Sequence, residues 1–169
     1  MTLISKYFGD IREALKTGAK ILTTITTNRG GEVEAQLVIH DPARFDNQFV
    51  SQTDAALEYF DDLDARVRGM LTATVRDEES PQGKIYLNQR DMDPAGKLSP
   101  ESFASALRVQ SVVISPDGGD ASPDRVAVTY LVDAFGMRQE FLAVIREGEG
   151  LVFREPEPKS ERETTAFLS

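Results

Sequence analysis

Residues 125–133, Arg-Val-Ala-Val-Thr-Tyr-Leu-Val-Asp, decide the fold because they place Val126, Val128, Tyr130 and Val132 at alternate positions. Successive side chains of a β-strand point to opposite faces, so this period of two predicts a strand that buries those four side chains. The next three residues, Ala134-Phe135-Gly136, are expected to turn the chain.

The neighbouring segments extend this pattern. Residues 109–114 form an apolar stretch that ends in Ser115-Pro116-Asp117-Gly118-Gly119, a dense group of turn-forming residues. Residues 137–146 run back from the Ala134–Gly136 turn, and residues 147–150 turn the chain again into Leu151-Val152-Phe153. Three tight connections between four apolar strands predict a four-stranded antiparallel meander.

A β-hairpin is predicted nearer the N-terminus. Residues 21–27 are rich in β-branched side chains, and residues 32–40 alternate, with apolar side chains at 33, 35, 37 and 39. Between them, Asn28-Arg29-Gly30-Gly31 supplies residues that tolerate a positive φ, as a tight hairpin turn requires. Ahead of the hairpin, residues 7–20 are expected to form a short strand or turn and a brief helical segment.

Helices are predicted between the hairpin and the meander. Asp41-Pro42 is expected to begin the first, because Asp caps free amides and Pro suits the first turn. Apolar residues then recur at steps of three, four or seven, as on one face of a helix; they are Phe45, Phe49, Ala56, Phe60, Leu63, Val67, Met70 or Leu71, and Val75. Such a run exceeds the usual length of a globular helix, so a break is expected near Asp61-Asp62.

Residues 77–83, with Ser80-Pro81 and Gly83, are expected to end this helical region. Residues 84–88 allow two interpretations, one more helical turn or a short strand, and residues 91–96 are a predicted loop. Ser99-Pro100 predicts the start of another helix.

The order of these elements predicts an α+β fold: an N-terminal β-hairpin, two to three helices and a C-terminal four-stranded antiparallel meander. One domain is expected over residues 1–155, followed by a polar tail at residues 156–169, whose Ala166-Phe167-Leu168 is its apolar part.

The composition limits the chemistry. The 169 residues include one His and neither Cys nor Trp, and 28 acidic against 19 basic residues give a net charge of −9. The chain therefore has little of the imidazole, thiolate and soft-ligand chemistry that enzymes use near neutral pH, which predicts a protein that is not an enzyme and holds no cofactor or metal. The acidic balance argues against nucleic-acid binding. The lack of Cys and of long apolar runs predicts a cytoplasmic protein with no membrane contact.

The densest acidic cluster on the predicted helices is Asp61, Asp62 and Asp64. A solvated helix face is the ordinary meaning of such a cluster; if it has a function, binding a basic protein is the simplest one. Arg29 projects from the predicted hairpin turn, where it either anchors an interface or points into water. These four residues form the candidate interaction surface.

Two acidic loops are weaker candidates for a cation site. Asp91 and Asp93 begin like a calcium loop, but Ala95 and Ser102 stand where further oxygen ligands are required. Asp117, Asp120 and Asp124 crowd one Gly-containing loop and could also simply make turns. A divalent-metal-dependent carboxylate enzyme is the resulting alternative hypothesis.

A family resemblance is carried by Tyr7-Phe8-Gly9-Asp10-Ile11, Ser99-Pro100-Glu101-Ser102-Phe103 and Val113-Ile114-Ser115-Pro116-Asp117-Gly118. Together with the element order, these residues resemble an uncharacterised bacterial family known only as a domain of unknown function, number two thousand and four. The resemblance spans residues 7–155 and implies no established activity. Members of that family have histidines where Asn88-Gln89 stands here and a Tyr where Ile114-Ser115 stands, so a site built on those histidines would be lost.

The leading hypothesis is a non-enzymatic, acidic protein-interaction domain that binds a basic protein, of which a toxin-neutralising immunity protein is one form. A structural homo-oligomer, such as a homodimer, is a further alternative, because residues 109–114 and 141–145 are apolar on both faces and a second copy could cover the sheet.

Overall fold

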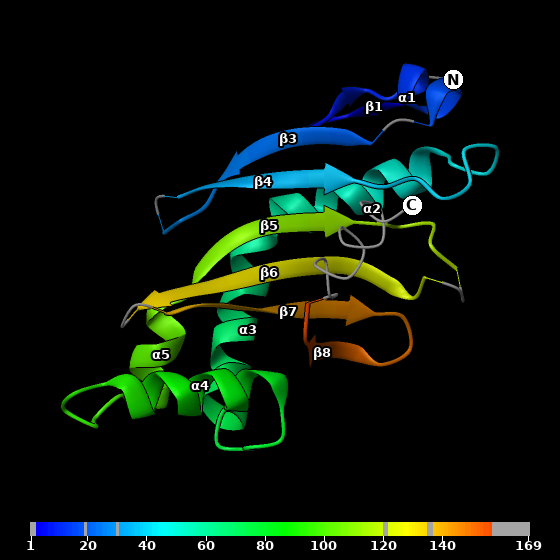
Figure 1. Cartoon of the computed structure of the whole chain (residues 1–169). Helices are drawn as coiled ribbons and strands as arrows, with labels where there is room; N and C mark the ends of the chain where they lie inside the picture. The colour runs from blue at the N-terminus through cyan, green and yellow to red at the C-terminus, as the bar shows by residue number, and fades with distance from the viewer. Residues whose placement is uncertain (1–2, 19, 30, 120–121, 135–136, 157–169) are drawn as a thin grey trace, which may run out of the picture.

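The structure is a computed structural model that describes residues 3–18, 20–29, 31–119, 122–134 and 137–156. Residues 157–169 of the predicted tail, with Ala166–Leu168, and the turn residues 135–136 lie outside the described residues. The fold is α+β, as predicted. Helices and strands follow one another in the order β-β-α-β-β-α-α-α-α-β-β-β-β (Figure 1).

One six-stranded sheet contains both the predicted hairpin and the predicted meander, in the order β3-β4-β5-β6-β7-β8. Its strands are β3 (Ile21–Thr26), β4 (Glu32–Leu37), β5 (Arg108–Ile114), β6 (Asp124–Ala134), β7 (Met137–Arg146) and β8 (Gly150–Arg154). Every neighbouring pair is antiparallel except β4 and β5, which are parallel. The hairpin is therefore not a separate N-terminal unit, because the helices between β4 and β5 provide the long crossover that a parallel pair requires.

The first residues form a small unit of their own. β1 (Ile4–Ser5) pairs with β2 (Gly9–Asp10), and α1 (Arg12–Thr17) follows, in agreement with the predicted short strand and brief helix. Ser5 and Asp54 join this unit to α2 through a hydrogen bond of 2.5 Å between their side chains.

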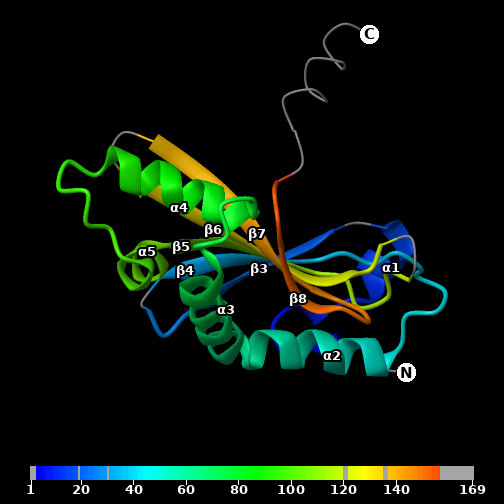
Figure 2. The same cartoon turned by 90° about the horizontal axis from the view of Figure 1, so that it is seen from below.

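The helical region begins later than predicted and breaks near the predicted position. α2 (Asn47–Glu58) is capped by Asp46, whose carboxylate accepts hydrogen bonds from the backbone of Gln48 and Phe49. Asp41-Pro42 belongs to a turn, because the Asp117 carboxylate accepts the backbone N–H of Asp41 at 2.8 Å. α3 (Phe60–Thr74) follows directly after Tyr59, so the break lies just before Asp61-Asp62 (Figure 2).

Two more helices bring the number described between β4 and β5 to four, where two to three were predicted between the hairpin and the meander. α4 (Pro81–Met92) includes residues 84–88, and Ser80-Pro81 begins this helix instead of ending the previous one. α5 (Pro100–Ala106) begins after the Ser99 cap, as predicted. A Ser-Pro pair is compatible with both a loop and a helix start. Here it starts a helix, because the Ser80 Oγ accepts a hydrogen bond from the Gly83 N–H at 3.0 Å and so caps α4.

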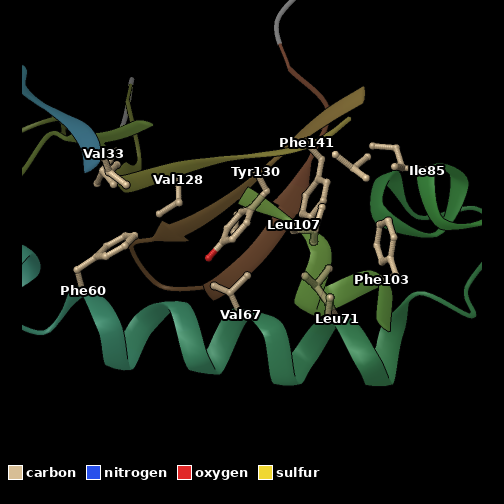
Figure 3. Close-up of a cluster of buried hydrophobic side chains, with 14 of the residues drawn as sticks. Val33, Phe60, Val67, Leu71, Ile85, Phe103, Leu107, Val128, Tyr130 and Phe141 are labelled. Carbon is tan, nitrogen blue, oxygen red and sulfur yellow. The ribbon is translucent and has the colours of Figure 1, made fainter. Parts of the chain in front are cut away.

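The core lies between one face of the sheet and helices α2 to α5 (Figures 2 and 3). Val128, Tyr130 and Val132 of β6 are buried as predicted, whereas Val126 is half-buried. Tyr130 stacks on Phe141 of β7 with ring centroids 5.6 Å apart. The larger core cluster joins side chains of the sheet to side chains of α2 to α5; those from the helices include Phe60, Val67, Leu71, Ile85 and Phe103. In the helices described, no segment is both long and apolar enough to span a membrane.

Candidate functional site

The hairpin turn between β3 and β4 contacts the first turns of α3 through a hydrogen bond and an ion pair. The backbone N–H of Asn28 donates to the Asp61 carboxylate at 2.9 Å, and the Arg29 Nε lies 3.4 Å from an oxygen of Asp64. The Arg29 Nη1 also reaches the Ser105 carbonyl on α5 at 3.5 Å. Three residues of the candidate interaction surface thus meet at one place, although 35 positions in sequence separate Arg29 from Asp64.

Asp64 is the centre of a buried polar network. Only 5% of the residue is exposed, and its two oxygens accept hydrogen bonds from the Arg68 Nε at 3.0 and 3.1 Å and from the Tyr130 hydroxyl at 2.7 Å. Figure 3 shows the Tyr130 ring extending from the sheet toward α3 with its hydroxyl foremost. Asp64 therefore does not contribute a free carboxylate to the surface, whereas Asp62 is exposed and Asp61 is half-buried.

Arg68 connects this network to α5. Its side chain is 7% exposed, and its Nη1 donates to the carbonyls of Ala104 and Leu107 at 2.5 and 2.9 Å. These carbonyls lie at the C-terminal end of α5, where a helix leaves its acceptors unpaired and a cation is favourable. The position of Arg68 four residues after Asp64 is a sequence signal for an ion pair on one helix face, and it could have predicted this contact.

Burial and the hydrogen bond to Asp64 raise the pKa of the Tyr130 hydroxyl far above its ordinary value. Tyr130→Phe is expected to lower the free energy of unfolding by about 1.5 kcal/mol at pH 7, since a hydrogen bond to a charged group is lost. Below about pH 10 the phenol is protonated in both states, so this stabilisation is complete. Above about pH 10 only the unfolded chain loses the proton, and the wild-type stability falls by about 1.4 kcal/mol per pH unit relative to the variant.

Urea unfolding of the wild type and Tyr130→Phe, followed by circular dichroism at pH 7, 10 and 11, checks this expectation. The stability difference between the two proteins should shrink from pH 10 to pH 11. Two pH profiles that stay parallel would contradict the role assigned to the Tyr130 hydroxyl.

A cleft of about 510 Å³ opens beside this network, and we call it the hairpin cleft. It exists because β4 and β5 pair only through Glu34–Leu37 and Ser111–Ile114, whereas β4 begins at Glu32 and β5 at Arg108. A bulge between Val109 and Ser111 shifts β5 relative to β6 at the same end. The cleft is lined by Thr27, Arg29, Gly31, Glu32, Val33, Asp64, Arg68, Leu107, Arg108, Val109, Gln110, Leu131 and Arg138.

The charge of the hairpin cleft is opposite to that of the whole chain. Its described lining holds four arginines against only two acidic residues, Glu32 and Asp64. Asp64 is already paired with Arg68 and Arg29. Arg108 and Arg138 are exposed, and among the described residues neither has an ion-pair or hydrogen-bond partner for its guanidinium. The cleft therefore offers two free guanidinium groups, whose planar forks suit carboxylate or phosphate oxygens.

The two acidic loops do not gather free carboxylates. The Asp117 side chain accepts the backbone N–H groups of His40 and Asp41, and Asp124 pairs with Arg146 at 2.9 Å and Arg154 at 3.0 Å. Asp93 accepts two backbone N–H groups of its own turn, while Asp91 is exposed. Asp120 lies outside the described residues. Within the described part of the chain, no group of three His, Cys, Asp or Glu side chains is placed to hold a metal ion.

The fold and the cleft together define an α+β domain with an arginine-lined opening at one end of a mixed sheet. Comparisons of the chain with models of protein families, with curated proteins and with solved structures each gave no match. Membership of the uncharacterised bacterial family is therefore still a prediction from the residues that resemble it.

Proposed function

We propose that this protein is an interaction domain that acts by binding a partner protein, with the hairpin cleft as its binding site. The observation that carries the proposal is the pair of unpartnered arginines, Arg108 and Arg138, at the opening of the cleft. The guanidinium of a lone exposed arginine is ordinarily solvated by water, but arginines grouped in a concave site are typical of binding surfaces.

Rigid surroundings support this proposal. The Asp64–Arg68 ion pair, the Tyr130 hydroxyl and the α5 carbonyls fix the wall of the cleft next to Arg29. A wall held by several hydrogen bonds loses little conformational entropy when a ligand binds, which favours affinity. The net charge of −9 favours a protein over a nucleic acid as the partner. The absence of Cys from the sequence supports a cytoplasmic location.

A basic protein partner, including a toxin held by an immunity protein, is a second proposal. The excess of acidic residues and the exposure of Asp62 on α3 support it. Asp61 and Asp64 contribute less to such a surface than their sequence suggests, because each is engaged by the hairpin turn. Of the three acidic residues, Asp62 is thus the one whose substitution tests a basic partner without disturbing the fold.

Photo-cross-linking in cells that make the protein tests the proposed site. A benzophenone amino acid at Gln110, which is exposed and lines the hairpin cleft, is expected to form a covalent adduct with a partner. The same amino acid at Glu13, which is exposed on α1, is the matched control and is expected to form none. Absence of an adduct at position 110, or equal adducts at both positions, would overturn the proposed site.

A further inference from the structure

The geometry of the hairpin cleft points to the chemistry of its ligand, an inference that rests on the proposed function. We infer that the cleft binds an extended acidic peptide segment of a partner protein. Acidic side chains of that segment pair with Arg108 and Arg138, and its main chain runs from the free edge of β5 beside Arg108 across the end of the sheet toward Arg138. Charge, strand edges and apolar lining support this ligand independently.

The first support is electrostatic. Arg108 and Arg138 carry two positive charges, and neither forms an ion pair with a described residue. Asp133 is the cross-strand neighbour of Arg138, and Glu140 follows it on the same strand, yet neither forms an ion pair with it among the described contacts. Carboxylates of an incoming ligand can therefore form charge-assisted hydrogen bonds there without displacing an existing partner.

The second support is the spacing of the two arginines. Arg108 of β5 lies opposite Leu131 of β6, which lies opposite Glu140 of β7, and Arg138 stands two residues before Glu140. Two strand spacings and two residue steps place the Cα atoms of the arginines about 12 Å apart. A single small anion would need donors that converge on one point. Because most of this distance lies across the strands, an extended segment of about four residues that crosses them spans it and brings one acidic side chain near each arginine.

The third support is the free main chain at the opening. The pairing of β4 with β5 begins only at Glu34 and Ser111, so the first residues of both strands, 32–33 and 108–110, have no partner across this gap. Strand edges of this kind bind extended peptides through main-chain hydrogen bonds, while pockets select alternate side chains.

The apolar lining selects those alternate side chains. Val33 and Leu107 line the cleft, and the small part of each side chain that is exposed there is apolar. A segment that alternates acidic and apolar residues presents one kind of side chain to the arginines and the other to this lining. An alternating Glu-Val peptide is therefore the matching probe.

Fluorescence anisotropy with a labelled Glu-Val-Glu-Val-Glu peptide tests the inference. The wild-type protein is expected to bind this peptide, more weakly at high salt, and to bind Gln-Val-Gln-Val-Gln at least tenfold more weakly. Arg108→Gln and Arg138→Gln should each weaken binding of the Glu peptide about tenfold. Arg76→Gln, an exposed position beyond the far end of α3, is the matched control and should leave binding unchanged.

Four outcomes would overturn the inference. These are no binding of the Glu peptide, equal binding of the Gln peptide, wild-type affinity in both arginine variants, and displacement of the peptide by inorganic phosphate at similar affinity, which would indicate a small-anion site. If a cross-linked adduct forms at Gln110 but the Glu peptide does not bind, the acidic ligand is rejected and the proposed interaction domain is not. Failure of both experiments would reject both proposals.

Discussion

Replacing Asp64 by alanine is expected to lower the free energy of unfolding by about 3–5 kcal/mol. The substitution leaves the guanidinium of Arg68, whose side chain is 7% exposed, without its carboxylate partner. It also leaves the Tyr130 hydroxyl without the acceptor at 2.7 Å, and it removes the ion pair that joins Arg29 of the hairpin turn to α3. A buried charge that loses its counterion costs far more than a surface ion pair contributes, because water cannot replace the lost partner.

Chemical denaturation followed by circular dichroism measures this loss, and Asp62→Ala is the matched control. Asp62 lies on the same helix and is exposed, so its substitution should change stability by no more than about 0.5 kcal/mol. Asp64→Asn should fall between the two, since an amide oxygen can still accept hydrogen bonds but carries no charge. An Asp64→Ala variant as stable as Asp62→Ala would show that the buried network does not support the fold.

The same network explains why sequence patterns identified the strands better than the site. Alternation is a local property, and it placed Val128, Tyr130 and Val132 in the core because their own strand repeats every two residues. The hydrogen bond from Tyr130 to Asp64 joins residues 66 positions apart, and no local pattern encodes it. The sequence pattern identified Asp64 by its charge. The burial of Asp64 depends on where α3 packs, which the pattern does not encode.

The helix boundaries show a second limit of sequence patterns. Asp41-Pro42 and Ser80-Pro81 are both good helix starts by composition, yet only the second begins a helix. The difference is tertiary, because the Asp117 carboxylate binds the backbone N–H groups of His40 and Asp41 and holds that segment as a turn. The apolar stripe had the same ambiguity between Met70 and Leu71, and packing resolved it: Leu71 is fully buried and Met70 is 36% exposed.

The hairpin cleft could not be predicted from composition at all. The net charge of −9 suggested an acidic binding surface, but net charge describes the average over the molecule and not the potential at one site. The parallel pairing of β4 with β5 brings Arg29, Arg108 and Arg138 to one opening, although they come from distant parts of the chain. Acidic residues elsewhere give the chain its net negative charge while this opening stays cationic, so a single chain can carry both kinds of surface.

Gly83→Ala is expected to destabilise the protein by about 2–3 kcal/mol, through the start of α4. A Cβ atom at position 83 would lie 1.8 Å from the backbone carbonyl oxygen of Asp77 and 2.7 Å from the Ser80 Oγ. The Asp77 carbonyl cannot yield easily, because it accepts hydrogen bonds from both the backbone N–H and the hydroxyl of Ser80. The turn must therefore open, and the cap that Ser80 makes to the Gly83 N–H at 3.0 Å is lost with it.

Gly69→Ala is the matched control within the same protein. Gly69 lies in α3, where an added Cβ would meet no heavy atom within 4 Å. Alanine is the better helix former, so this variant should gain about 0.5–1 kcal/mol, opposite in sign to Gly83→Ala. Denaturant unfolding of both variants measures the pair. If Gly83→Ala were also more stable than the wild type, the close approach of the Asp77 carbonyl to the first turn of α4 would be wrong.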